Sequence, residues 1–146
     1  MIEVIEPVMQ WLDDYAKRHR INLICESDLG PYDVSYTYRI PRTIYFNENW
    51  HSIKEMPFIY AHEIWHAICN KEDLIINCNL QSNIDENECK ANRFAIRLLL
   101  KYCRQNDVNI NSSYEFARSF GVPSKLQYLV DDIFKKEFGK HQKAFF

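Results

Sequence analysis

The segment that most constrains this chain runs from Phe58 to Ile68 and reads FIYAHEIWHAI. Its apolar residues fall on most sides of a helix, so a helix formed here has to be buried in the core. The same segment carries His62, Glu63 and His66, whose burial costs free energy unless each side chain finds a polar partner. The fold must therefore supply such partners within a layer of apolar side chains.

The spacing of these three residues indicates what the partner is. Two histidines four positions apart share one helix face, so His62 and His66 can both reach one zinc ion at the roughly 2.0–2.1 Å of zinc–imidazole bonds. Glu63 is rotated by about 100° from His62, which keeps it off the ligand face but lets it take a proton from a water on the metal. The H-E-x-x-H pattern arises by chance in about 1% of shuffled chains of this composition. It favours a hydrolytic zinc site over a buried helix with two hydrogen-bonded histidines.

A catalytic zinc requires a third protein ligand, and the segment DENECKANRFAIRLLL offers one. In a helix, the face of Glu88 also carries Ala91, Asn92, Ala95 and Leu99, whereas the face of Glu86 carries Lys90, Arg93 and Arg97. The first face is small and apolar and the second is charged, so we expect Glu88 to point inward and Glu86 outward. Asn92 could hydrogen-bond the second nitrogen of a histidine. The alternative role for Glu88 is a capping box with Asp85.

HEIWH followed by ECKANRFAIRLLL resembles the ImmA/IrrE family of metallo-endopeptidases, whose pattern is HExxH and then E-x-x-A-N-x-F-A with a run of leucines. The resemblance implies a gluzincin-like site in a zincin-like domain, with Zn²⁺ as the cofactor. The ligands would be His62, His66 and Glu88, and Glu63 would be the catalytic base. It also implies a protein substrate, a helix–turn–helix repressor of a mobile element, phage or stress response. Trp65 replaces a common glycine of the family, and this leaves the ligand set intact.

The pattern along the chain predicts an α+β fold, with a small antiparallel sheet packed on a helical core. We expect helices at about 3–19, 52–70, 86–102, 112–121 and 126–138, a strand at INLIC, a hairpin of SYTYRI and TIYFN, and a loop at 71–84. Ser52 and Glu55 have capping-box spacing, although Pro57 favours a helix start near itself. The length predicts one domain over residues 1–146, with 112–138 as its C-terminal helical part.

The TIYFN strand directly precedes the predicted metal helix. If it is an exposed edge, an extended substrate peptide could add to it as a further strand and lay its scissile carbonyl over the zinc. A purely structural role in the sheet is the alternative. This predicted edge strand consists of Thr43, Ile44, Tyr45, Phe46 and Asn47.

Composition and charge limit the possible partners. The net charge is −2 and the apolar runs are short, so we expect neither a direct nucleic-acid partner nor a membrane span. Five cysteines, an odd number without a secretory signal, favour free thiols and a cytoplasmic location. The remaining histidines, His19, His51 and His141, are expected at the surface.

Two alternative functions remain open. The stretch FARSFGVPSKLQYLV is typical of a helix–turn–helix, with Ala117 and Gly121 at its small positions, so the chain could be a DNA-binding regulator. It could also be a module that holds zinc and binds a partner without cutting it. The second helix of this motif would carry Asp131 and Asp132 as well as Lys125, Lys135 and Lys136, which weakens the DNA-binding interpretation.

Overall fold

The helices and strands follow one another in an α+β order, and the computed structural model describes residues 2–69 and 81–139. The elements are α1 (Ile2–Arg18), β1 (Asn22–Glu26), β2 (Tyr36–Arg39), β3 (Arg42–Asn47), the 3₁₀ helix η1 (Ile53–Glu55), α2 (Met56–Ile68), α4 (Gln81–Gln105), α5 (Ser113–Phe120), the 3₁₀ helix η2 (Ser124–Leu126) and α6 (Gln127–Phe138). The predicted fold class and the predicted hairpin of β2 and β3 are confirmed.

The three-stranded sheet is mixed and has the order β1-β3-β2. β2 pairs antiparallel with β3, as predicted, but β1 pairs parallel with β3, so the prediction of an antiparallel sheet is correct for one pairing and wrong for the other. The prediction that Thr43–Asn47 forms an edge is also wrong, because these residues belong to the central strand. The central position of β3 agrees with its burial, since its side chains are the most buried of the three strands and Ile44 is fully inside.

The connection between β1 and β2 carries the chain across the sheet, and Asn47 fixes its course. The Asn47 side chain donates hydrogen bonds to the carbonyl oxygens of Gly30 and Asp33, at 2.8 and 2.7 Å. Its backbone N–H donates to the Ser35 hydroxyl at 2.8 Å. These bonds deliver the chain to the start of β2 on the side of β3 opposite β1. β2 is therefore an edge strand of the sheet.

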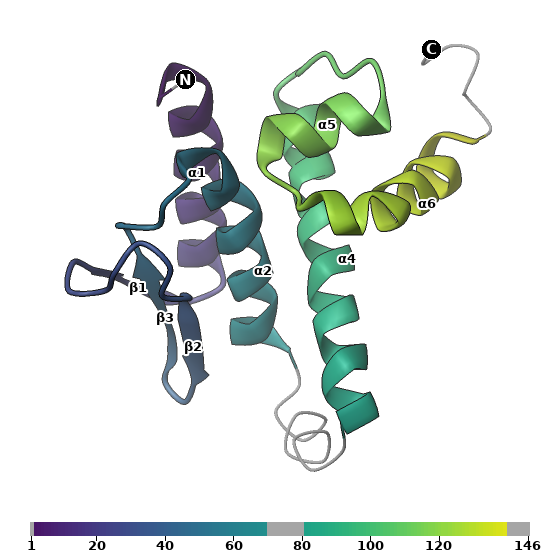
Figure 1. Ribbon diagram of the computed structural model, residues 1–146. Helices are drawn as coiled ribbons and strands as arrows, with labels where there is room; N and C mark the ends of the chain where they lie inside the picture. The colour runs from purple at the N-terminus through teal and green to yellow at the C-terminus, as the bar shows by residue number, and fades with distance from the viewer. Residues whose placement is uncertain (1, 70–80, 140–146) are drawn as a thin grey trace.

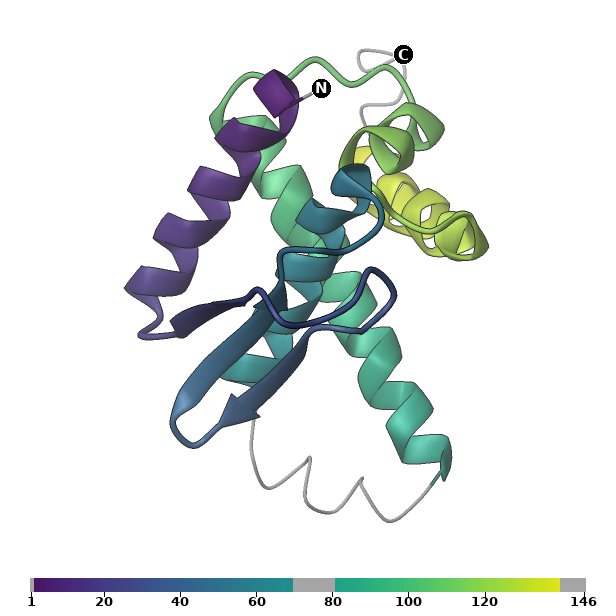
Figure 2. The same ribbon diagram turned by 60° about the vertical axis from the view of Figure 1, so that its left-hand side comes forward.

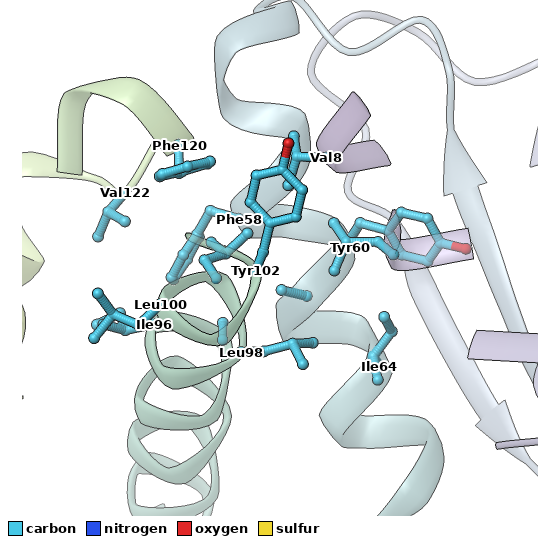
Figure 3. Close-up of a cluster of buried hydrophobic side chains, with 14 of the residues drawn as sticks. Val8, Phe58, Tyr60, Ile64, Ile96, Leu98, Leu100, Tyr102, Phe120 and Val122 are labelled. Carbon is cyan, nitrogen blue, oxygen red and sulfur yellow. The ribbon is translucent and has the colours of Figure 1, made fainter. Parts of the chain in front are cut away.

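α2 lies between the sheet and α4, and α5 and α6 pack across the C-terminal half of α4 (Figures 1 and 2). Buried side chains join these layers into a core. In Figure 3, Phe58 and Tyr60 leave α2 in different directions, Phe58 toward α4 and α5 and Tyr60 toward α1. Tyr60 donates a hydrogen bond to Asp13 at 2.7 Å, which satisfies its buried hydroxyl. α2 is thus enclosed, as its apolar sequence predicts.

The starts of α2 and α4 differ from the helix ranges predicted from the sequence. Ser52 precedes η1 but its side chain makes no capping hydrogen bond, and α2 itself begins at Met56 with Pro57 in its first turn. α4 begins at Gln81, so residues 81–84 are helical although a loop was expected there; residues 70–80 of that expected loop lie outside the described residues. Asp85 lies inside α4, so it cannot be an N-cap that pairs with Glu88.

α5 begins and ends as its sequence predicts. The Ser112 hydroxyl accepts a hydrogen bond from the Glu115 backbone N–H at 3.1 Å and thereby caps the helix. The Glu115 carboxylate accepts a hydrogen bond from the backbone N–H of Asn111, not from that of Ser112, so the two side chains do not form a reciprocal capping box. Gly121 ends α5 with φ of 76°, a left-handed conformation that glycine adopts without strain. A Cβ at Gly121 would collide with the backbone oxygen of Lys54, so the absence of a side chain lets α5 pack against η1.

Two further expectations concern surfaces and thiols. Among the described cysteines, Cys25, Cys69, Cys89 and Cys103 form no disulfide, and Cys78 lies outside the described residues. Within residues 2–69 and 81–139, the helices lack the combination of length and apolar character that a bilayer crossing demands.

Candidate metal centre

α2 and α4 bring together the three side chains predicted to bind a metal. The Nε2 atoms of His62 and His66 are 3.1 Å apart. The Glu88 carboxylate lies 3.1 Å from His62 Nε2 and 3.0 Å from His66 Nε2, one oxygen facing each ring. Close approach of the two helices makes this possible, since Ala91 and Ala95 of α4 are fully buried. His62, His66 and Glu88 thus form a cluster that could hold a metal ion.

The geometry of this cluster fits a tetrahedral metal site. Zinc–ligand bonds of 2.0–2.1 Å place neighbouring ligand atoms of a tetrahedron about 3.3–3.4 Å apart. The observed separations of 3.0–3.1 Å are shorter by only a few tenths of an ångström. Two imidazole nitrogens and one carboxylate are also a ligand set of catalytic zinc sites, which leave the fourth position open.

Asn92, one turn after Glu88, makes the contact that the sequence predicts. Its side-chain oxygen lies 2.9 Å from His62 Nδ1, and because an amide oxygen only accepts, that nitrogen donates. A neutral His62 therefore turns the lone pair of Nε2 toward the lone pairs of Glu88. Two acceptors at this distance repel each other unless a cation or a proton lies between His62 Nε2 and the Glu88 carboxylate. The hydrogen bond to Asn92 orients the ring so that Nε2 can bind a metal ion or a proton.

The charges of the cluster are strongly coupled. Burial lowers the pKa of His62, but the hydrogen bond to Glu88 and the negative charges of Glu88 and Glu63 outweigh it, so its pKa is raised above the usual value. The pKa of Glu88 is held far below its usual range, because His62 and His66 in their protonated forms donate hydrogen bonds to its carboxylate. Glu88 thus stays ionised although only half of its side chain is exposed. A carboxylate has to be ionised in order to bind a metal ion.

Glu63 occupies a different part of the helix face and is almost fully buried, with 9% of its surface exposed. Its Oε1 accepts a hydrogen bond of 2.6 Å from the Thr37 hydroxyl on β2. Burial raises the pKa of Glu63 above its usual value, and the bond from Thr37 and the nearby histidines oppose this rise. One carboxylate oxygen is thus fixed by β2, while Glu63 still lines the same cavities as His62 and Glu88.

The cluster lies in a cleft with two cavities that differ in chemistry. One, with a volume of about 440 Å³, continues along β2 and is the more polar of the two, with Ser35, Thr37 and Arg39 in its wall. Arg39 Nη1 is buried there and has no hydrogen-bond partner among the described residues. The other, of about 360 Å³, reaches toward η1 and the α5–α6 connection and has mainly apolar walls. The strand beside the site is therefore β2, whereas the sequence analysis had expected β3 there.

Thr37, Arg39 and the connection at Leu126 were not predicted from the sequence. All three reach the site through tertiary contacts, because they lie 23 or more residues from the nearest histidine of the cluster. The only local signal was the alternation of β2, which turns Thr37 and Arg39 to one face of the strand. The alternation of β2 does not indicate that Thr37 and Arg39 lie near Glu63.

The residues predicted to lie away from the metal do so where the structure describes them. Glu86 is exposed and pairs with Lys90 at 3.8 Å, so the predicted opposition of Glu86 and Glu88 is correct. His51 is exposed, whereas His19 is half-buried and its Nδ1 lies 2.9 Å from the Tyr15 carbonyl oxygen. His141 lies outside the described residues.

Comparison with known proteins agrees with this geometry. Neither the curated proteins nor the solved structures gave a match. The model of one peptidase family, described as the IrrE N-terminal-like domain, matches residues 16–126. This range includes the three residues of the cluster, Glu63, and the strand that carries Thr37. The chain therefore belongs to the IrrE N-terminal-like family of metallopeptidases.

Proposed function

We propose that the protein is a zinc-dependent endopeptidase in which His62, His66 and Glu88 hold the metal. The observation that carries this proposal is the convergence of the three side chains within 3.0–3.1 Å of one another, with Glu63 beside them. The absence of a thiolate from the set, together with membership in a peptidase family, favours a hydrolytic zinc over a structural one.

Glu63 is the catalytic base of this proposal. Bound zinc would supply Lewis acidity toward the peptide carbonyl and toward an attacking water. Glu63 accepts the proton of that water and then delivers it to the leaving amine nitrogen. The Thr37 hydrogen bond holds one carboxylate oxygen, which leaves the other to exchange protons. Asn92 keeps the His62 ring in the orientation that points Nε2 to the metal.

The substrate peptide lies along the free edge of β2. An extended peptide can pair with an exposed edge through backbone hydrogen bonds, and β2 is such an edge in the observed strand order. Val34 and Ser35 line both cavities of the cleft, and Tyr36, Thr37 and Arg39 line the cavity that continues along β2. A strand added here would pass over Glu63 and the metal ligands, which is the position that the sequence pattern had suggested for β3.

The substrate class of this proposal is a helix–turn–helix repressor of a mobile element, phage or stress response. The family resemblance of the HEIWH and ECKANRFAIRLLL motifs supports it. We do not favour direct DNA binding by α5 and α6. Residues 112–138 carry four acidic and four basic side chains, and Asp132 pairs with Arg93 of α4 at 3.1 Å.

The metal site is tested by two glutamates on opposite faces of α4. Glu88→Gln should lower zinc occupancy and abolish activity, because a neutral amide is a poor zinc ligand. Glu86→Gln is the matched control: it removes only an exposed pair worth roughly 0–1 kcal/mol, so zinc and activity should stay nearly unchanged. Bound zinc per chain is measured by native mass spectrometry at equal chelator concentration. Loss of zinc in Glu86→Gln with retention in Glu88→Gln would overturn the proposed ligand set.

The substrate class is tested by co-expression with folded repressors encoded in the same genetic neighbourhood. We expect cleavage of one of them at one or a few sites, and no cleavage when the Glu63→Gln variant replaces the wild type. Casein serves as the unstructured control and should remain largely intact. Broad degradation of casein would count against a selective endopeptidase.

A further inference from the structure

The apolar cavity beside the metal cluster has no role in the chemistry described above. It has a volume of about 360 Å³, at the lower end of the range for ligand pockets, which suits one or two side chains rather than a folded segment. Its apolar walls come from four parts of the chain: Val34 before β2, Trp50 before η1, Phe58 and Ile59 on α2, and Pro123 and Leu126 in the connection between α5 and α6.

These walls are firmly held. Phe58 is 6% exposed, and Figure 3 shows it directed toward Phe120 and Val122 of the α5 region. Leu126 is 9% exposed and belongs to the same core. Gly121 places the connection against η1, since there is no room for even one further carbon atom between them. The cavity is therefore a preformed part of the fold.

Three polar groups at the border of the cavity already have partners, and Lys125, which also lines it, is exposed to solvent. The Trp50 indole donates to Glu55 at 3.1 Å, and the Ser35 hydroxyl accepts from the Asn47 backbone. Asn92 bonds His62, as described above. A polar or charged side chain that entered the cavity would thus lose its water without gaining an equivalent partner, whereas an apolar one would gain burial.

The cavity is also continuous with the reaction site. His62, Glu63 and Glu88 line it together with the residues named above, and the same three line the polar cavity along β2. A peptide that runs along β2 with its carbonyl at the metal would have the side chain next to the scissile bond at the mouth of the apolar cavity.

We propose that this cavity is the specificity pocket of the protease and binds an apolar side chain, of leucine or phenylalanine size, next to the bond that is cut. The inference rests on the proposed function for its role in cleavage. It also assigns a role to the α5–α6 connection: Leu126, which stands in the helix–turn–helix-like stretch, limits the depth of the pocket and thereby the size of the accepted side chain.

Binding is measured without any turnover. The probes are N-acetyl amino acid N-methylamides of leucine, phenylalanine, alanine and aspartate, titrated into the full chain with and without zinc. The readout is the NMR shift of the Trp50 indole, assigned with Trp50→Phe. The leucine and phenylalanine probes should bind at least tenfold more tightly than the alanine and aspartate probes, since burial of extra carbon atoms is the driving force. Equal binding of all four probes would overturn the proposal.

Variants of the pocket wall test the size limit. Leu126→Ala should shift the preference at least threefold toward phenylalanine, and Leu126→Phe should shift it at least threefold toward alanine. Opposite shifts cannot come from a loss of stability alone. Tyr128→Ala is the matched control, because Tyr128 is 64% exposed and does not line the cavity. If the Leu126 variants do not fold, Ile59→Ala, on the part of the wall that α2 supplies, replaces Leu126→Ala with the same expected direction.

The pocket and the protease can fail independently. A chain that binds the leucine probe selectively but holds no zinc and cuts nothing would support the pocket and refute the proposed function. A chain that holds zinc and cuts its substrate but binds the four probes equally, or shows the Leu126 effects also in Tyr128→Ala, would refute the pocket and leave the protease standing.

Discussion

The hydrogen bond from Thr37 to Glu63 links the edge strand to the proposed base, and Thr37→Val removes it with little change in shape. The bond is 2.6 Å long and its acceptor is a carboxylate that is 9% exposed. A hydrogen bond to a charged group contributes roughly 1.5–3 kcal/mol. It favours the ionised form of Glu63, so its loss raises the pKa of that carboxyl further. At about 1.4 kcal/mol per pH unit, the change corresponds to roughly 1–2 pH units.

A general base works only when ionised, so activity falls as the pH drops through its pKa. The acid limb of the kcat profile should therefore move to higher pH by roughly 1–2 units in Thr37→Val. Thr37→Ser keeps the hydroxyl and should restore the wild-type limb. Thr43→Val is the control on β3, where the lost bond goes to the Pro41 carbonyl oxygen. An unmoved limb in Thr37→Val, or the same movement in Thr43→Val, would refute this role of Thr37.

Three further changes should have measurable effects. Asn92→Ala should weaken zinc binding about 10–100-fold in a chelator competition, because His62 loses the group that orients it; unchanged affinity would contradict this. Gly121→Ala should reduce the free energy of unfolding by about 2–5 kcal/mol, from a left-handed backbone and the collision with Lys54, whereas Gly139→Ala has open space and should change stability little in urea titrations. The affinity for zinc should already fall as the pH drops toward about 6.5, the ordinary histidine value, because the pKa of the metal-free His62 is raised and the proton competes for Nε2; an affinity that stays constant down to that pH in a chelator competition would contradict it.

The local parts of the site could be predicted from the sequence because they depend on helix periodicity. The spacing of His62 and His66 determines their common face in any regular helix. The small residues around Glu88 and the charged ones around Glu86 distinguish the two glutamates by helix face alone. Asn92 follows from the same periodicity, since it lies one turn from Glu88 on the same face.

The order of the strands could not be predicted in this way. The hairpin of β2 and β3 is a local pairing, whereas the parallel pairing of β1 with β3 depends on where the intervening connection crosses the sheet. The length of TIYFN does not distinguish an edge from a central strand. The contact of Thr37 with Glu63 depends on this order, because β2 is the edge strand of the sheet and lies against α2.

The start of α4 and the caps were missed for another reason. Residues 81–83 are polar and Ile84 is a single apolar residue, so no apolar stripe marks this segment as helix, although it continues α4 by one turn. Ser52 and Glu55 have the spacing of a capping box, but Glu55 instead accepts from the Trp50 indole, and a tertiary contact thus overrides the local pattern.

The central claim is that Glu63 performs the proton transfers of a peptidase whose zinc it does not bind. The most direct measurement compares cleavage of the identified substrate by wild type and Glu63→Gln after both have been loaded to the same zinc content per chain. We predict that Glu63→Gln retains its zinc, because the ligand atoms are untouched, and loses at least about 10²-fold in kcat. Turnover equal to that of the wild type at equal zinc content would contradict the account.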